Sequence, residues 1–123
     1  MEIERNDAVV DLDHLAQYTS GDRALEAELF ELFLTNGRAY LTAMSSAGDA
    51  AAWCEAAHAL KGSARGIGAK IVARISAEAE AVTEMPVSGE RDRMLAALRG
   101  ALTDVEAFAH ASYPSFGQYG AGV

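Results

Sequence analysis

The sequence contains few of the residues on which several protein classes depend. Its 123 residues include one cysteine and two prolines, and ten basic residues stand against eighteen acidic ones, which gives a net charge of −8. A single thiol excludes an internal disulfide framework and a cysteine-rich zinc site. The acidic balance argues against nonspecific binding to DNA or RNA, because a phosphate backbone would be repelled by such a surface.

Long apolar runs are also missing. No segment approaches the ~20 apolar residues of a membrane span, and the first ten residues, MEIERNDAVV, are too acidic for a signal peptide. We therefore expect a cytoplasmic protein with no membrane contact. The length and the 50% of hydrophobic residues are enough for one folded domain with a hydrophobic core, and too little for two.

The alternation of apolar and polar residues that is typical of β-strands is missing as well. Between Leu12 and Tyr113, alanine, leucine, glutamate and arginine dominate, and apolar residues recur at helical spacing. The sequence therefore predicts an all-α fold. Its helices are expected at about 12–19, from the TSGD turn to 46, and at about 50–65, 69–85 and 90–111.

The helix boundaries rest on capping residues. Ser20 or Asp22 can cap the second predicted helix and Asp49 the third, while Gly66 and Gly68 are expected to end the third. Four long amphipathic helices with short loops favour an antiparallel up-down-up-down four-helix bundle, with the first helix as a short extra N-terminal helix at one end.

The bundle is expected to occupy residues 11–112. Residues 1–10 are predicted to form an N-terminal tail and residues 113–123 a C-terminal tail. The C-terminal tail is rich in glycine and aromatic residues, and we expect Tyr113 or Phe116 to pack it onto the bundle.

One histidine, His58, lies on the third predicted helix, opposite the apolar stripe. The stripe recurs at intervals of three and four and consists of Trp53, Ala57, Leu60, Ala64 and Ile67. At ~100° per residue, His58 lies about 150° from the centre of this stripe. We therefore expect its imidazole to face water.

Lys61, Gly62 and Arg65 follow His58 at i+3, i+4 and i+7 and so share its side of the helix. A glycine inside a helix costs roughly 1 kcal/mol relative to alanine. On the exposed side Gly62 relieves no crowding in the core. The gain we infer is clearance beside His58 for the backbone of another protein.

The charge around His58 is unlike that of the rest of the chain. Between Ala56 and Ala77 there is no acidic residue, whereas there are four basic ones, Lys61, Arg65, Lys70 and Arg74. This distribution predicts a local anion site. An exposed imidazole is largely neutral near pH 7 and can act as a nucleophile without a dedicated base. An ordinary surface histidine is the usual alternative, and these neighbours argue against it.

The segment AHALKGSARGIGA, residues 57–69, resembles the signature of the histidine-containing phosphotransfer (HPt) domains of multistep two-component phosphorelays. The family pattern is His-x-Leu-Lys-Gly-Ser/Ala-Ala/Ser, followed after a short gap by an apolar residue, Gly and often Ala. The matching residues are His58, Leu60, Lys61, Gly62, Ser63, Ala64, Ile67, Gly68 and Ala69. The segment 10–34 is similar to the usual opening of such domains, whose fold is a helical bundle.

The resemblance implies that His58 is transiently phosphorylated on Nε2, that Lys61 helps to neutralise the phosphoryl group and that Gly62 keeps the site open. It implies response-regulator receiver domains and a hybrid sensor kinase as partners. The receiver would bring Mg²⁺, an acidic pocket and the aspartate that exchanges the phosphoryl group. The chain itself is expected to be a monomeric carrier without a cofactor, a metal or ATP-dependent kinase activity.

Four further residues are candidates for contacts with the phosphoryl group or the partner: Arg65, Ser63, Glu80 and Phe30. Many relatives have a glutamine 22 residues after the histidine, where this chain has Glu80. A carboxylate can accept a hydrogen bond from imidazole but repels a phosphoryl group, so the role of that glutamine does not transfer directly. Phe30 and Phe33 are candidates for an exposed apolar part of the docking surface, with core packing as the alternative for both.

Other functions fit the sequence less well. GSARGIG also matches the nucleotide-binding turn of short-chain dehydrogenases, but that turn needs a preceding strand, and WCEAAHALK is helical. Cys54 and His58, at i and i+4, are too few ligands for a stable zinc site. The open alternative is a binding module that docks or sequesters a receiver without transferring phosphate. The intact His58, Lys61 and Gly62 argue against it.

Overall fold

The computed structural model describes residues 9–117, which form five helices and no strand. The helices are α2 (Leu12–Thr19), α3 (Arg23–Ser46), α4 (Ala50–Ile67), α5 (Lys70–Glu80) and α6 (Ser88–Ser112). The prediction of an all-α fold is confirmed. None of the helices in this described part is both long and apolar enough to cross a membrane.

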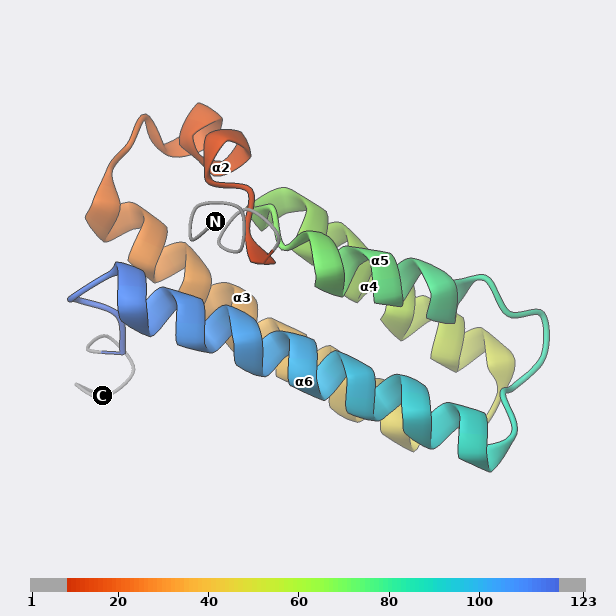
Figure 1. Cartoon of the computed structure of the whole chain (residues 1–123). Helices are drawn as coiled ribbons and strands as arrows, with labels where there is room; N and C mark the ends of the chain where they lie inside the picture. Colours follow the sequence, from red (N-terminus) through yellow and green to blue (C-terminus); the bar gives the residue numbers. More distant parts are fainter. Residues whose placement is uncertain (1–8, 118–123) are drawn as a thin grey trace.

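Helices α3 to α6 pack side by side, and α2 lies at one end of them (Figure 1). Helix α3 contacts α4 and α6, and α5 contacts the same two helices. The connections from α3 to α4 and from α5 to α6 lie at the end far from α2 (Figure 1). The turn from α4 to α5 lies near α2, since the Asp11 amide donates to the carbonyl of Gly68 at 2.8 Å.

Aspartates begin the first three described helices. The side chains of Asp11, Asp22 and Asp49 each accept a hydrogen bond from the backbone N–H three residues later, at 2.9 to 3.1 Å. Such a bond satisfies one of the free donors of a helical first turn. The predicted caps Asp22 and Asp49 are confirmed.

Helix α4 runs to Ile67, two residues beyond the predicted end, and stops at Gly68 alone. Gly68 has a φ of 85°, in the left-handed region that favours glycine. A Cβ at this position would lie 2.9 Å from the carbonyl oxygen of Asp11. Gly68 therefore ends the helix and also lets the entry to α2 pack against the α4–α5 turn.

Helix α5 ends at Glu80, and the prediction that it continues to Met85 was wrong. The carbonyl of Ala79, one of the last four of the helix, accepts the indole N–H of Trp53 at 2.8 Å, which satisfies an acceptor that the helix end leaves free. Pro86 disfavours helical backbone at the residue before it and lacks an N–H of its own. The helical spacing of apolar residues continues to Val82 and Met85, although the helix itself has ended at Glu80.

One hydrophobic core joins all five helices. The predicted stripe of α4 is buried along its whole length, with Trp53, Ala57, Leu60 and Ala64 fully buried and Ile67 nearly so. Gly37 brings α3 close to α6, because a Cβ there would lie 3.1 Å from a methyl carbon of Leu102. The inner side of α4 is thus fixed by packing, and its outer side is left for other roles.

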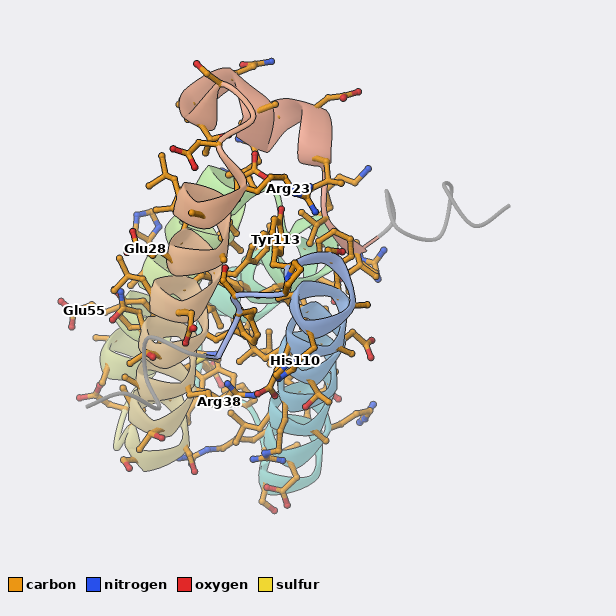
Figure 2. All side chains as sticks on the ribbon, turned by 90° about the vertical axis from the view of Figure 1, so that its left-hand side faces the viewer. Arg23, Glu28, Arg38, Glu55, His110 and Tyr113 are labelled. Atoms are coloured by element: carbon orange, nitrogen blue, oxygen red, sulfur yellow. The ribbon has the colours of Figure 1, made fainter. Side chains whose placement is uncertain are left out.

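A buried polar cluster ties α2, α3 and the end of α6 together. Glu26, only 4% exposed, accepts hydrogen bonds from the hydroxyls of Thr19 at 2.6 Å and Tyr113 at 2.9 Å. Arg23 lies over the Tyr113 ring, 4.4 Å from its centroid (Figure 2). Burial, followed by the hydrogen bond to Glu26, raises the pKa of the Tyr113 hydroxyl. The cluster links residues 87 positions apart in the sequence.

The predicted tails contribute to the packed structure where they are described. Val10, expected in the N-terminal tail, is fully buried, and Tyr113 and Phe116 pack into the core as expected. Residues 1–8 and 118–123, the rest of the two predicted tails, lie outside the described residues.

Candidate functional site

His58 projects from the outer side of α4. Its side chain is 68% exposed, as its angle from the apolar stripe predicted. The opposite side of the same helix carries Trp53, Ala57 and Leu60 into the core. The packed helix therefore fixes the backbone position of His58 and leaves its imidazole accessible to another protein.

Glu80, the last residue of α5, joins His58 and Lys61. Its Oε2 lies 2.6 Å from Nδ1 of His58, and its Oε1 lies 2.5 Å from Nζ of Lys61. Lys61 stands one turn after His58 on α4, and α5 packs beside that helix. One carboxylate thus bridges an imidazole and an ammonium group.

The charge of Glu80 determines which nitrogen of the His58 imidazole carries the proton. The hydrogen bond from Lys61 and then that from His58 hold the pKa of Glu80 below its ordinary value of 4.5. Glu80 is therefore ionised at neutral pH, and an ionised carboxylate can only accept hydrogen bonds. Nδ1 of His58 must carry the hydrogen that it donates. In the neutral ring, Nε2 then keeps its lone pair.

Lys61 is more enclosed than its position on an outer helix face requires. Its side chain is 17% exposed, and its ammonium group pairs with Glu80. The structure thus brings Lys61 beside His58, as the i+3 spacing predicted, and gives it a carboxylate partner that the sequence analysis did not assign.

Gly62 and Gly66 leave bare backbone beside His58. A Cβ added at either position would meet no atom within 4 Å. Neither glycine is therefore needed for packing among the described residues. Gly62 lies one turn from His58 and Gly66 one turn further along α4, so another backbone can come close to the helix here.

An apolar groove of about 210 Å³ lies beside Gly66, between α2, α3 and α4. Its lining includes Tyr18 from α2, Leu32 and Phe33 from α3, and Ser63 and Gly66 from α4. Tyr18 and Leu32 are 67% and 57% exposed. Large apolar side chains gathered at a surface are typical of interaction sites.

The prediction that Phe30 contributes to an exposed docking surface was wrong. Phe30 is fully buried, and its ring packs against Phe108 and Tyr113 at centroid distances of 5.8 and 5.5 Å. Its ring therefore faces α6 and Tyr113, the residue that follows α6. Phe33 is also buried, with only an edge on the groove.

Sequence reasoning missed the exposed apolar residues that do line the groove. Leu29 and Leu32 line the groove, and together with Leu25, which lies outside it, they recur at i, i+4 and i+7 and form a stripe of their own on α3. This stripe turns away from the one that contains Phe30. Two adjacent apolar stripes on one helix are a signal that could have identified Leu32.

The remaining candidates lie apart from the Glu80 bridge. Arg65 is exposed two turns along α4 from His58, and Ser63 lies in the wall of the groove. Cys54 points towards α5, with Sγ 3.4 Å from the carbonyl oxygen of Glu80. Within residues 9–117, no three potential metal-ligating side chains gather at one place.

The fold and the site together define an all-helical protein that presents one histidine, oriented by a carboxylate, on the outer face of a helix. A model of the family described as Hpt domain matches residues 28–108, which contain α4, α5 and most of α3 and α6. The chain belongs to this HPt family. Comparisons with curated proteins and with solved structures give no match.

Membership of the HPt family links the chain to phosphotransfer in two-component signalling. Domains of this family carry phosphoryl groups in phosphorelays and are not kinases, and they interact with response-regulator receiver domains.

Proposed function

We propose that this chain is a phosphorelay carrier in which His58 takes a phosphoryl group from the aspartate of one receiver domain and passes it to that of another. The observation that carries this proposal is the 2.6 Å contact between Glu80 and Nδ1 of His58. This contact leaves Nε2 as the free nucleophile on an exposed ring. The carrier acts in the cytoplasm as a monomer, and a hybrid sensor kinase feeds the relay.

The bundle that presents His58 is antiparallel and up-down-up-down, with α2 as a short extra N-terminal helix. The positions of the three connections between α3 and α6 support this arrangement (Figure 1). His58 then lies near the middle of α4, away from the connecting loops, where a flat partner surface can approach it.

The transfer step is an in-line displacement at phosphorus. Nε2 of His58 attacks the phosphorus of the aspartyl phosphate, the P–N bond forms, and the P–O bond breaks to release the aspartate carboxylate. Nδ1 keeps its proton, so the ring becomes a cation. The Glu80 carboxylate lies against that nitrogen and stabilises the positive charge as it develops. The reverse reaction returns the phosphoryl group.

The negative charge of Glu80 is compatible with phosphorylation of His58. Glu80 contacts the ring at Nδ1, whereas the phosphoryl group binds to Nε2 on the other side of the ring. Lys61 balances the carboxylate, so the arriving phosphoryl group meets no net negative charge from this pair. Mg²⁺ belongs to the receiver, and this chain supplies the oriented nucleophile.

The receiver docks over α4. Gly62 and Gly66 lie beneath its backbone, and one of its apolar side chains enters the groove beside Tyr18 and Leu32. The open space above both glycines and the exposure of the groove residues support this placement.

A second candidate function is docking or sequestering of a receiver without transfer. It would use the same groove and glycines but not the reactive nitrogen. The Glu80 bridge favours transfer, because docking alone gives no reason to orient an imidazole.

Phosphotransfer profiling tests the proposal. The full chain is incubated with each receiver domain of the source organism carrying a labelled phosphoryl group. We expect at least one receiver to label the wild-type chain and His58→Gln to abolish labelling, with an unchanged helical circular dichroism spectrum because His58 is exposed. Label retained by His58→Gln would exclude His58. A wild-type chain that binds receivers but takes no label would favour the sequestering function.

A further inference from the structure

Within residues 9–117, some cations of this acidic protein have a partner and others, Arg99 on α6 among them, form no ion pair or side-chain hydrogen bond with the described residues. Around α3 and α6, most arginines donate to a carboxylate or a carbonyl oxygen: Arg23, Arg38, Arg91 and Arg93. Arg65, Lys70 and Arg74 form neither an ion pair nor a side-chain hydrogen bond with the described residues. All three are exposed. We call them the basic strip.

The basic strip lies on α4 and α5, the two helices that supply His58 and Glu80. Arg65 follows His58 by seven residues, so both project from the same side of α4. Lys70 and Arg74 stand one turn apart on α5, which packs beside α4 and whose last residue, Glu80, reaches His58. The strip therefore begins near the α4–α5 turn and extends towards the histidine.

Folding does not explain the basic strip. Lys70 and Arg74 are like charges at i and i+4, a spacing that weakens a helix slightly. Arg65 gains no partner from α5. Three exposed cations that have no partner within residues 9–117, in a protein with a net charge of −8, point instead to an anionic partner.

The sign of the exposed charges also differs between the two sides of His58 along α4. Glu55, three residues before His58, is exposed and points away from the bundle (Figure 2). Arg65 lies on the other side of His58 along the helix axis. An acidic surface laid along α4 is therefore attracted at one end and repelled at the other.

We propose that the basic strip, Arg65, Lys70 and Arg74, binds an acidic surface of the receiver domain and selects one of its two orientations along α4. The proposal rests on the proposed function, since it names the chemistry of the partner surface at the same site. Charge complementarity of this kind mainly increases the association rate and excludes wrong orientations. The strip then aligns the receiver before its apolar contact enters the groove.

Association kinetics of matched charge variants test this role. Receiver domains of the source organism are first ranked by binding to the immobilised full chain, and the tightest binder is the probe. The strip variant is Arg65→Gln/Lys70→Gln/Arg74→Gln. The control is Arg38→Gln/Arg93→Gln/Arg99→Gln, which removes the same net charge near α6, a helix that packs on α3 and α5. Circular dichroism checks that both variants fold.

We expect the strip variant to lose roughly tenfold in association rate at low ionic strength, and the loss to shrink as salt is raised. The control should stay near the wild type. Equal association rates and equal salt dependence in both variants would overturn the proposal. If the strip variant binds the receiver more slowly but the wild-type chain takes no phosphoryl label, the role of the basic strip is upheld and the proposed transfer function is overturned.

Discussion

At the scale of single residues, Glu80 determines the state of the site. Its carboxylate holds Nδ1 of His58 as a donor and keeps Lys61 beside the ring. Because the pKa of Glu80 is lowered, the ionised bridge is complete above pH 4.5 and is lost only as pH falls through the lowered value. Around neutrality, Glu80 therefore stays an ionised acceptor for Nδ1 of His58.

Lys61→Met tests which neighbour controls Glu80. The hydrogen bond from Lys61 is the largest cause of the lowered pKa, so its removal should raise the pKa of Glu80 towards 4.5. His58→Gln should raise it less. Carbon-detected NMR titration of the Glu80 carboxyl group measures both shifts. A larger rise in His58→Gln than in Lys61→Met would reverse the order of the two causes.

At the scale of the elements, one side of α4 packs into the core and the other side carries the candidate site. The buried stripe holds the helix in the core, while Gly62 and Gly66 keep part of the outer side free of side chains. A helical glycine in open space gives up stability that another residue would supply. For Gly62, which lies one turn from His58, we infer that the benefit is room for the backbone of a partner.

Gly62→Leu should separate these two effects. Leucine has open space there and a better helix propensity, so we expect the free energy of unfolding to rise by up to about 1 kcal/mol in urea denaturation. We expect receiver affinity to fall, because the side chain blocks the approach to His58.

Gly100→Leu is the matched control for Gly62→Leu. Gly100 lies in α6, is exposed and also has open space around its Cβ position. It should gain similar stability without losing receiver affinity. If both variants bind the receiver equally well, the clearance assigned to Gly62 is wrong.

At the scale of the whole molecule, the Glu26 cluster joins α2 and α3 to Tyr113 at the end of α6. Tyr113→Phe keeps the ring but leaves a buried Glu26 oxygen without its donor. Loss of a buried hydrogen bond to such a group should lower the free energy of unfolding by about 1–3 kcal/mol. Tyr40→Phe, at a half-buried tyrosine of α3, should change it by less than ~0.5 kcal/mol. Urea denaturation of both variants measures the difference, and equal values would show that the cluster does not stabilise the fold.

Patterns within single helices predicted much of this molecule. The caps Asp22 and Asp49 and the outward position of His58 each depend on residues within a few turns, so local rules were sufficient. At the early end of α5, the indole of Trp53 from another helix donates to the carbonyl of Ala79. No pattern within α5 contains that contact.

The same limit applies to the site. The spacing on α4 places Lys61 and Gly62 beside His58, but the bridge by Glu80 requires the distance between two helices. Phe30 was misplaced for a related reason. Its environment is set by Phe108 and Tyr113, which lie far along the chain and reach it only in the folded bundle.

The exposure of His58 has a consequence for signalling on the proposed function. A phosphoryl group on an exposed nitrogen would be available to every receiver that can bind next to it. Rival receivers would then draw from it in proportion to their abundance and their rates of association. Overproduction of one receiver would deplete the supply to the others, so the output of the pathway would depend on the relative amounts of its components.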